Sequence, residues 1–421
     1  MKVTIHPSGI SGIINAPPSK SSMQRICAAA LLHKGTTLIN NPGNSKDDLA
    51  AIKTISLLGA QVHQQNNSLV VSSKGINPIS SVLNCGESGL GLRMFAPIAA
   101  LSAMNITLEG EGTLNNRPMD FFDGIFPQLN VDTKSNNGKL PLSIKGPLHP
   151  KSITIDGSLS SQFLTGLLFA YAAACTEEVV LEVTNLVSKP YIDLTIDVLK
   201  TFGYHIINQE YRQFIIKPAS KSGELYSVSV EGDWSGASFL LVAAAIAGEV
   251  TVSGLQMNSS QADRQIIEAL RLTGTEFSET TGGLHVSKSE LSAFEFDATE
   301  CPDLFPPLVA LAAYCRGISK ISGVHRLKHK ESDRGFTLQQ EFAKLGVSIG
   351  STGNDMIVNG TGTVIGAEVH SHHDHRIAMA CSVAALNGNG STTIAEAEAI
   401  NKSYPSFYAD LKQLKAVLEL H

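Results

Sequence analysis

The chain has 421 residues, which is too long for one compact core and suits two domains of about 200 residues each. Apolar residues make up 43% of it and charged residues 17%, which is typical of a globular protein and excludes a disordered one. The net charge of −6 argues against a broad basic face for nucleic acid, so an anionic ligand would need a local group of Lys and Arg.

The first residues predict a strand over Lys2–His6 and contain no apolar leader, and no apolar run is long enough to span a bilayer. The six cysteines show no CxxC spacing, and several lie in apolar runs. We therefore expect reduced, mostly buried thiols in a cytoplasmic protein without a membrane partner.

The segment Pro17–Leu32 combines a polar, cationic head with an apolar, Ala-rich tail. Its first two residues are prolines, which do not fit inside a helix, so the helix begins at the Ser19-Lys20 pair. The first N–H groups of a helix lack partners, and the helix dipole adds partial positive charge to those of Lys20 and Arg25. This end suits a phosphate or carboxylate, although one such segment alone is better interpreted as an ordinary surface helix.

The design is repeated along the chain at intervals of about 70 residues. Each copy has an apolar helix with a polar head, a short strand, a second polar node and a more amphipathic helix. The short strands are Thr36–Asn40, Ile106–Gly110, Leu181–Asn185, Val250–Gly254, Ser319–Gly323 and Thr392–Glu396. The heads are SKSSMQR, GESGLGLR, GSLSSQF, GDWSGAS, CPDLFPP and HHDHR, and the nodes are SKDD, NNRP, SKPY, QADR, KESDR and NKSYP.

Helices that alternate with short strands predict an α/β (α+β) fold, and helices that are apolar nearly all round should be buried between sheets. Six copies divide most simply into two domains of three, residues 19–230 and residues 1–18 with 231–421. A tail helix over Tyr404–Leu420 should close the last copy. Because that copy has no downstream strand pair, the N-terminal strand Val3–Ile5 is expected to supply one.

Lys and Arg fall at the heads and nodes, close to predicted helix N-termini, where they oppose the helix dipole. Their repetition indicates that they jointly hold anions in a cleft between the domains. The alternative is that these residues are independent surface charges. For Lys189 alone we favour this alternative. The residues are Lys20, Arg25, Arg117, Lys189, Lys330, Arg334, Arg376 and Lys402.

Two acids lie among these cations. Asp303 is flanked by prolines and apolar residues, and Glu331 lies between Lys330 and Arg334. An Asp and a Glu beside a cationic pocket can divide the work of base and acid. A capping Asp and a surface ion pair explain them equally well from the residues alone.

The histidines at positions 370, 372, 373 and 375 do not favour a metal site, because adjacent residues point apart and Arg376 repels a cation. The chain has no phosphate-binding GxxxxGK[ST] loop, no strand–GxGxxG–helix fingerprint and no GxSxG elbow. The pattern therefore favours a transferase or lyase that acts on phosphorylated, carboxylated small molecules without metal or cofactor.

Together the heads and nodes resemble the EPSP synthase family, the 3-phosphoshikimate 1-carboxyvinyltransferases, along the whole chain. The segments that carry the resemblance are Pro18–Arg25, Asn116–Met119, Asp156–Thr165, Leu186–Asp193, Pro302-Asp303, Lys330–Arg334, Asp374–Arg376 and Lys402. The resemblance implies two similar domains of three βαβαββ units with helices inside sheets, an inside-out α/β barrel. It also implies that the domains close over shikimate 3-phosphate and phosphoenolpyruvate, and we expect a monomer.

The resemblance also assigns roles to residues by position. It implies that Asp303 is the base toward the 5-hydroxyl of shikimate 3-phosphate and Glu331 the proton donor to C3 of phosphoenolpyruvate. Lys20 and His375 would stabilise charge or assist proton transfer. Shikimate 3-phosphate would be held by Ser21, Arg25, Ser160, Ser161, Gln162, Ser188, Asp303 and Lys330. Phosphoenolpyruvate would be held by Lys20, Gly89, Arg117, Gln162, Arg334, Arg376 and Lys402.

The chain departs from the family where it has Glu87-Ser-Gly-Leu90, since Asn-Ala-Gly-Thr is common there. Glu87 and Leu90 are therefore not expected to bind substrate, whereas Gly89 would let the backbone approach it. Two alternatives are a related transferase acting on UDP-N-acetylglucosamine and a non-catalytic anion-binding protein on the same scaffold. The Lys20-Ser21 pair disfavours the first, and the presence of both Asp303 and Glu331 disfavours the second.

Overall fold

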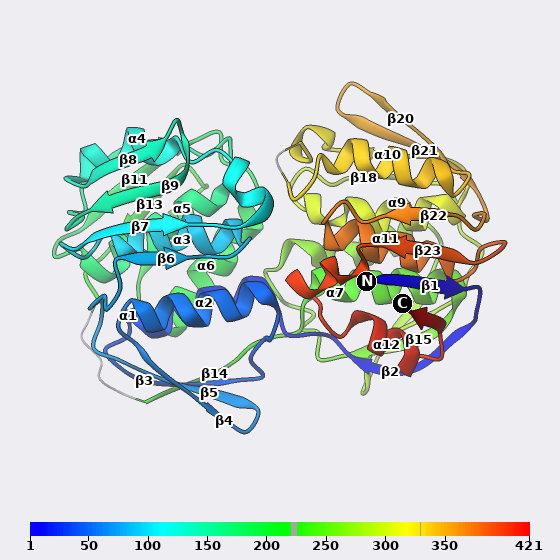
Figure 1. Cartoon of the computed structure of the whole chain (residues 1–421), viewed down its shortest axis with the longest axis horizontal. Coiled ribbons are helices and arrows are strands. Elements are labelled where there is room, and N and C mark those ends of the chain that lie inside the picture. Colours follow the sequence, from blue (N-terminus) through cyan, green and yellow to red (C-terminus); the bar gives the residue numbers. More distant parts are fainter. Residues whose placement is uncertain (220–224, 329) are drawn as a thin grey trace. The chain divides into compact units, whose positions relative to one another are not determined.

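The computed structural model describes residues 1–219, 225–328 and 330–421 and divides the chain into two compact units (Figure 1). The N-terminal unit is Lys20–Val230, and the C-terminal unit combines Met1–Ser19 with Glu231–His421. None of the described helices is both long enough and apolar enough to cross a membrane.

The N-terminal unit contains three four-stranded sheets with the same internal order. In each, the first two strands are parallel, and the third and fourth add on antiparallel. The sheets are β14 (Tyr226–Ser229), β3 (Gly35–Asn40), β5 (Ser68–Ser73) and β4 (Gln61–Gln65); β6 (Val82–Asn84), β7 (Asn105–Glu109), β9 (Lys139–Lys145) and β8 (Asp132–Asn136); and β10 (Ile153–Asp156), β11 (Val179–Thr184), β13 (Gln213–Ile216) and β12 (Ile206–Gln209).

The C-terminal unit repeats this arrangement, and in its first two sheets the strand order is the same. Its sheets are β2 (Ile10–Asn15), β15 (Gly248–Ser253), β17 (Gly283–Ser287) and β16 (Glu276–Thr280); β18 (Glu295–Asp297), β19 (Arg316–Ser322), β21 (Asp355–Thr361) and β20 (Ser348–Thr352); and β22 (Glu368–His370), β23 (Thr392–Ala395), β1 (Lys2–His6) and β24 (Val417–Leu420). Within the described residues the strands form six separate sheets rather than one closed barrel.

The Ala-rich helices form the cores, as predicted. In α7 every residue except Ser235 is buried, and in α11 every residue is buried. A helix with apolar side chains all round is most stable when sheets cover it on every side, because this removes those side chains from water. The helices are α1 (Lys20–Leu32), α3 (Gly89–Ala99) and α5 (Ser161–Ala174) in the N-terminal unit, and α7 (Trp234–Ala247), α9 (Phe305–Tyr314) and α11 (His375–Ala385) in the C-terminal unit.

The nodes lead into shorter or more amphipathic helices, also as predicted. Four of these helices are followed by a glycine with positive φ, a conformation that residues with a side chain rarely adopt: Gly59, Gly203, Gly274 and Gly346. The helices are α2 (Lys46–Leu57), α4 (Phe121–Ile125), α6 (Lys189–Thr201), α8 (Ile266–Leu272), α10 (Arg334–Lys344) and α12 (Phe407–Gln413). Short 3-10 helices are η1 (Gly112–Asn116), η2 (Phe126–Leu129), η3 (Ala262–Gln265), η4 (Pro302–Leu304), η5 (Val324–Arg326) and η6 (Ala397–Lys402).

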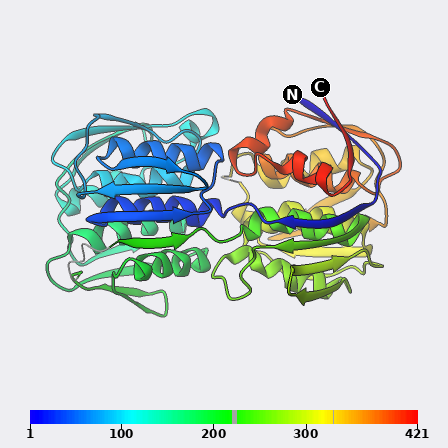
Figure 2. The ribbon, with the colours of Figure 1, turned by 90° about the horizontal axis from the view of Figure 1, so that it is seen from below.

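The tail was predicted wrongly in part, because the helix ends at Gln413 and Val417–Leu420 is the strand β24. Lys415 between them has φ 74°, which a continuing helix does not allow. The N-terminal strand does join this last sheet, as predicted, and lies between β23 and β24. Lys2 and His421 exchange backbone hydrogen bonds, so the two chain ends lie side by side (Figures 1 and 2).

Candidate active site

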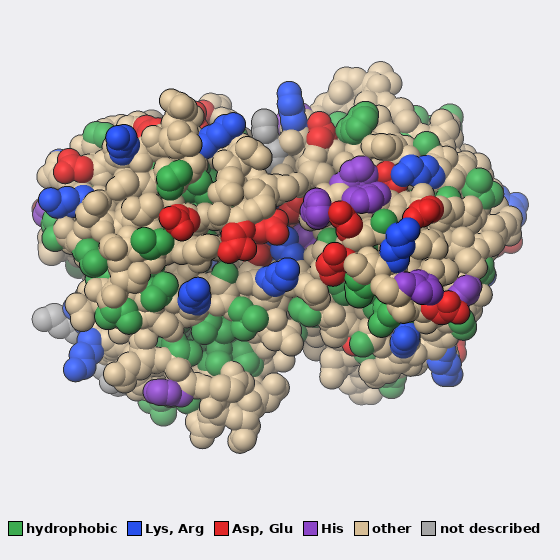
Figure 3. Space-filling view, in the orientation of Figure 1, with side chains coloured by type: hydrophobic (Ala, Val, Ile, Leu, Met, Phe, Trp, Pro, Cys, Tyr) green, Lys and Arg blue, Asp and Glu red, His purple; other side chains and the backbone are tan. Residues whose placement is uncertain are grey.

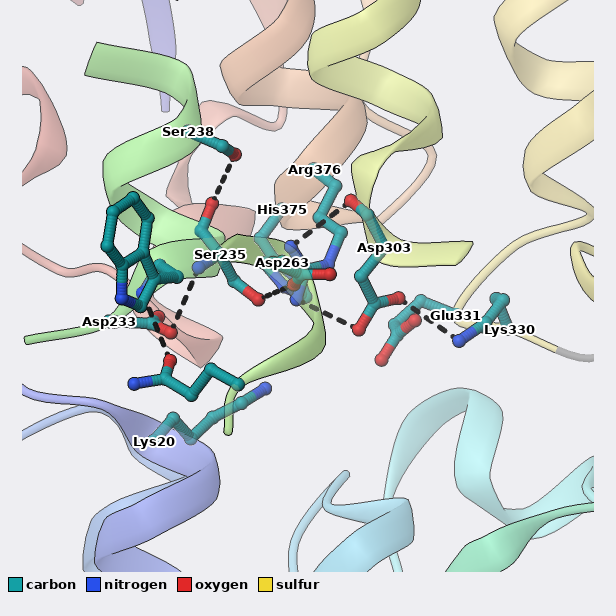
Figure 4. Close-up of polar contacts among 12 residues, drawn as sticks. Lys20, Asp233, Ser235, Ser238, Asp263, Asp303, Lys330, Glu331, His375 and Arg376 are labelled. Atoms are coloured by element: carbon teal, nitrogen blue, oxygen red, sulfur yellow. Dashed lines mark hydrogen bonds and ion pairs between the residues drawn. The ribbon is translucent and has the colours of Figure 1, made fainter. Parts of the chain in front are cut away.

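The starts of three helices of the C-terminal unit meet at Asp303, which lies in η4 just before α9 (Figure 4). Its Oδ1 accepts hydrogen bonds from Lys330 Nζ at 3.0 Å and Arg334 Nη1 at 2.8 Å. Its Oδ2 accepts one from Arg376 Nη2 at 3.1 Å. Burial opposes ionisation, but Arg376, Lys330 and Arg334 outweigh it and hold the pKa of Asp303 well below its usual range.

Arg334, the first residue of α10, is fully buried and joins three acids. Besides Asp303, it donates from Nη2 to Glu331 Oε2 at 2.6 Å and from Nε to Asp374 Oδ2 at 2.9 Å. Burial would lower the pKa of Arg334, yet the three carboxylates together raise it. The cations at these helix starts are therefore compensated by acids, which the sequence pattern did not reveal.

Glu331 is linked to two cations. Its Oε2 accepts from Arg334, and its Oε1 lies 3.7 Å from the Nζ of Lys402, the last residue of η6. The side chains of Glu331 and Lys402 are only 13% and 6% exposed. This pairing differs from a surface ion pair, since its partners lie in a largely dry region where electrostatic interactions are stronger.

Asp374 organises the start of α11. It caps the helix by accepting from the backbone N–H of Arg376 at 3.0 Å, while its other oxygen binds Arg334. The next residue, His375, is 1% exposed, and its Nδ1 lies 3.9 Å from Asp374 Oδ1. One carboxylate thus fixes both the helix that carries Arg376 and the orientation of Arg334.

The start of α1 in the N-terminal unit holds Lys20, whose Nζ lies 3.0 Å from Asp47 Oδ2 on α2. The side chains are 15% and 4% exposed, respectively. Asp47 was not predicted as a site residue, although it lies in the SKDD node. The pair keeps the ammonium at the head of α1.

Arg25 lies one turn further into α1 and is almost completely buried. Its guanidinium donates to Thr195 Oγ1 at 2.9 Å and to the backbone oxygens of Ser21 and Tyr191 at 2.8 and 3.2 Å. All three acceptors are neutral, and burial lowers the pKa of Arg25 to about 10. It therefore remains charged at neutral pH, which suits a site that receives an anion.

The starts of α3 and α5 meet through an arginine that the sequence analysis did not select. Arg93 Nη1 donates to Gln162 Oε1 at 2.9 Å, and its guanidinium carbon lies 4.8 Å from the centroid of the Phe163 ring. Beside them, a β-carbon on Gly89 would lie 2.7 Å from Arg117 Nη1 and 3.5 Å from Gln162 Oε1. The first group that a side chain at Gly89 would displace is therefore the Arg117 guanidinium.

The predicted serines lie at helix starts in the same unit. Ser160 caps α5 by accepting from the backbone N–H of Gln162, and Ser161 is the buried first residue of that helix. Ser188 precedes α6 with φ 55°, a conformation that costs a residue with a side chain about 1 kcal/mol or more. Such strain is common at ligand sites. Lys189 lies with its Nζ 5.5 Å from the Tyr211 ring centroid.

The predicted residues thus fall into two groups, one in each unit. The contacts of the C-terminal unit bring together Asp303, Lys330, Glu331, Arg334, Asp374, His375, Arg376 and Lys402. Those of the N-terminal unit bring together Lys20 with Asp47, Ser21 with Arg25, and Gly89, Arg93, Arg117 and Gln162. Asp47, Arg93 and Asp374 were not among the predicted residues, and each lies in a head or node of the repeat, which was the available signal.

Histidine side chains gather on the surface of the C-terminal unit (Figure 3). The ring centroid of His370 lies 4.8 Å from that of His372. His372 Nε2 lies 2.8 Å from Glu341 Oε1, and His373 Nδ1 lies 3.1 Å from Glu396 Oε2. No group of three or more His, Cys, Asp or Glu in the described part of the chain is arranged to hold a metal ion.

Solved structures share this fold. The EPSP synthase from Acinetobacter baumannii is 25% identical, with a TM-score of 0.83 over 99% of both chains. The enolpyruvyl transferase NikO from Streptomyces tendae is 17% identical, with a TM-score of 0.78 over 99% of this chain and 98% of that one. The fold is therefore that of the enolpyruvyl transferase class.

Sequence comparison narrows the class. The 3-phosphoshikimate 1-carboxyvinyltransferase of Clostridium perfringens is 35% identical over 99% of both chains. That of Clostridium acetobutylicum is 37% identical over 98% of this chain and 97% of its own. Residues 5–411 match the family described as EPSP synthase (3-phosphoshikimate 1-carboxyvinyltransferase), and the chain belongs to that family.

Proposed function

We propose that this chain transfers the enolpyruvyl (1-carboxyvinyl) group of phosphoenolpyruvate to the 5-hydroxyl of shikimate 3-phosphate and releases phosphate. The observation that carries the proposal is the network around Arg334, in which Asp303 and Glu331 share one buried guanidinium. Two acids of different surroundings within one cationic cluster are what a reaction with two proton transfers requires.

The cations of this network exceed its linked acids. Lys330, Arg334, Arg376 and Lys402 face Asp303, Glu331 and Asp374. In the structure these three acids offset three of the four positive charges. We propose that the phosphate and carboxylate of phosphoenolpyruvate, when they bind, replace some of the contacts that the acids make with Arg334, Arg376 and Lys402.

This exchange of partners would prepare the base. Asp303 surrounded by three cations is a weak proton acceptor, because they hold its pKa low. When the substrate anions share those cations, the pKa of Asp303 rises toward the range in which it can accept a proton. The base would thus become effective only in the loaded site.

The proposed reaction balances in two steps. Asp303 takes the proton of the 5-hydroxyl while the hydroxyl oxygen bonds to C2 of phosphoenolpyruvate. Glu331 gives a proton to C3. The resulting tetrahedral intermediate then returns a proton from C3 to Glu331, re-forms the double bond and breaks the bond between C2 and the phosphate oxygen, while Asp303 gives its proton to the leaving phosphate. Lys20, Arg334 and Arg376 would stabilise the charge that develops on the leaving phosphate.

The N-terminal unit would hold shikimate 3-phosphate. Arg25 is a buried cation, and its three hydrogen bonds within the described part of the chain reach neutral oxygens. Ser160, Ser161, Gln162 and Ser188 lie at helix starts, which favour anions. We propose that the two groups of residues act on one pair of substrates, in a site to which both units contribute.

The direct test measures phosphate release from the purified protein. We expect release only when shikimate 3-phosphate and phosphoenolpyruvate are both supplied. Release with UDP-N-acetylglucosamine in place of shikimate 3-phosphate would contradict the proposal. Tight binding of both substrates without turnover would show a binding protein instead.

The proposed acids are tested by Asp303→Asn and Glu331→Gln. Each should lower kcat by about 10²- to 10⁴-fold, the usual contribution of one acid–base group. Shikimate 3-phosphate should still raise the melting temperature of both variants. The control is Asp355→Asn, which removes a surface carboxylate paired with Lys320 and should leave kcat unchanged. Wild-type turnover in the first two variants would refute their roles.

We further propose that the protein acts as a monomer in the cytoplasm. All six cysteines are free and buried, which agrees with a reducing compartment. Sedimentation at micromolar concentration should give one species of the chain's own mass, and a concentration-dependent dimer would contradict this proposal.

A further inference from the structure

Asp263 is a buried carboxylate for which the proposed reaction has no use. It lies in η3, is 1% exposed and accepts a hydrogen bond at Oδ2 from Ser235 Oγ on α7. Its Oδ1 is buried and meets no hydrogen-bond donor in the described part of the chain. A buried carboxylate oxygen without a donor costs free energy when the carboxyl group is ionised, so we expect Asp263 to have a role that compensates this cost.

Asp263 lies beside the residues that are proposed to bind phosphoenolpyruvate (Figure 4). The charged groups that act on it are Asp303 from η4, Arg376 from α11 and Asp233 at the start of α7. The Cys301 thiol is also near, and Asp263 contributes to raising its pKa. Arg376 therefore acts on two carboxylates, Asp263 and Asp303, of which only the second is exposed enough to meet a substrate directly.

We propose, on the basis of the function proposed above, that Asp263 is a positioning residue that competes with anionic substrate for Arg376. When Asp263 is ionised it attracts the guanidinium, and when it is protonated it leaves the guanidinium to the substrate anion. Binding of the anion is thus linked to uptake of one proton from water, and no covalent bond changes. Because the two equilibria are linked, protonation of Asp263 raises the affinity for the anion by the same factor by which the bound anion favours protonation.

The surroundings place this switch near neutral pH. Burial raises the pKa of Asp263 first, and the charge of Asp303 raises it further, while Arg376 and Ser235 oppose them, which gives about 7. An ordinary Asp would remain ionised throughout this range.

The test compares the KM for phosphoenolpyruvate between pH 6 and 8.5 in the wild type, Asp263→Asn and the control Asp355→Asn. In the wild type and the control, the rise in KM between pH 6 and 8.5 should exceed the rise in Asp263→Asn by about fivefold or more. An effect of about fivefold is the lower end of the usual coupling between two sites. Ionisation of the substrate cancels in this comparison. An identical pH dependence in all three proteins would overturn the inference.

A second variant separates the proposal from simple loss of structure. Ser235→Ala removes a donor that favours the ionised form of Asp263, so the rise in KM should move to higher pH while its size is kept. A role limited to packing would lower stability without moving this transition. Movement to lower pH would contradict the proposal.

Two readouts remain valid even if turnover fails and the proposed reaction is refuted. Sulfate does not titrate in this range, and its affinity should fall between pH 6 and 8.5 in the wild type more than in Asp263→Asn. The melting temperature gives the second, because a carboxyl whose pKa is raised on folding loses stability as pH rises through the folded value. The wild type should therefore lose stability relative to Asp263→Asn between about pH 4, where an unfolded Asp is already ionised, and about pH 7, and the difference should stay constant above that. Parallel curves over the whole range in both assays would overturn the inference.

Discussion

Gly89 is the first residue of α3, and what surrounds it shows why single atoms matter in this protein. A β-carbon there would lie 2.7 Å from Arg117 Nη1, closer than atoms in contact are found. The backbone itself is ordinary helix, so the need for glycine comes from the neighbouring guanidinium rather than from its conformation. The sequence analysis had expected the substrate to be what a side chain would meet.

At the residue scale we predict the effect of Gly89→Ala. The methyl group should displace Arg117 and raise the KM for phosphoenolpyruvate by about tenfold, or ~1.4 kcal/mol. The melting temperature should stay the same or rise, because Ala favours a helix over Gly by about 1 kcal/mol. Steady-state kinetics and thermal unfolding measure the two effects.

Gly124→Ala is the matched control, since Gly124 lies in α4 and a β-carbon there meets nothing within 4 Å. It should gain the same helix propensity without a change in KM. If Gly89→Ala also left KM unchanged, the proposed contact between Arg117 and substrate would be ruled out.

At the scale of elements, the beginnings of the buried helices are held by side chains. Ser88, Ser160, Asp233 and Asp374 each accept from a backbone N–H in the first turn of a helix. Capping satisfies donors that have no other partner once sheets cover the helix. Asp374 also neutralises the buried Arg334, so helix capping and substrate-site electrostatics depend on one carboxylate.

We predict that Asp374→Asn separates these two roles. Asn caps a helix about as well as Asp, so the capping should survive. Loss of the charge opposite the buried Arg334 should lower the free energy of unfolding by about 3 kcal/mol. Denaturant unfolding at neutral pH measures the change.

Asp333→Asn provides the comparison, because Asp333 caps α10 from an exposed position and forms no salt bridge with any residue that the structure describes. Its free energy of unfolding should change by less than about 0.5 kcal/mol. Equal losses in both variants would mean that the charge of Asp374 contributes nothing beyond the cap.

At the scale of the whole molecule, each unit has its own core. The N-terminal unit is one continuous segment, and its apolar core cluster lies entirely within residues 23–230. Its first sheet is completed by β14, the last strand of the segment, which pairs with β3 in parallel. The C-terminal unit needs both chain ends, since β1 lies between β23 and β24.

We predict that residues 20–230, expressed alone, fold cooperatively because every strand of their sheets lies within the segment. Shikimate 3-phosphate should raise the melting temperature of this fragment, and phosphate release should be absent because Asp303 and Glu331 are missing. Circular dichroism, thermal unfolding and the phosphate assay report these outcomes. In contrast, residues 231–421 alone lack β1 and β2 and should not fold without them. Cooperative folding of that second fragment would contradict the assigned role of the N-terminal strands.

The sequence by itself determined the repeat, the apolar helices and most strands, because these depend on short-range patterns of side chains and turn residues. It also selected Asp303, Glu331 and the cations, through their place at heads and nodes and through the family resemblance. Only the tertiary structure decided which acid neutralises which cation. Arg334 and Asp374 are 40 residues apart, and no local pattern links them.

The same limit explains the errors. The residues Val417–Leu420 form a strand because β1 supplies hydrogen bonds from the opposite end of the chain, whereas four residues alone are compatible with a helix end. Asp263 looks like an ordinary turn residue until burial and the charge of Asp303 change its ionisation. Packing and electrostatics act through space, and distance in space is the quantity that a sequence does not contain.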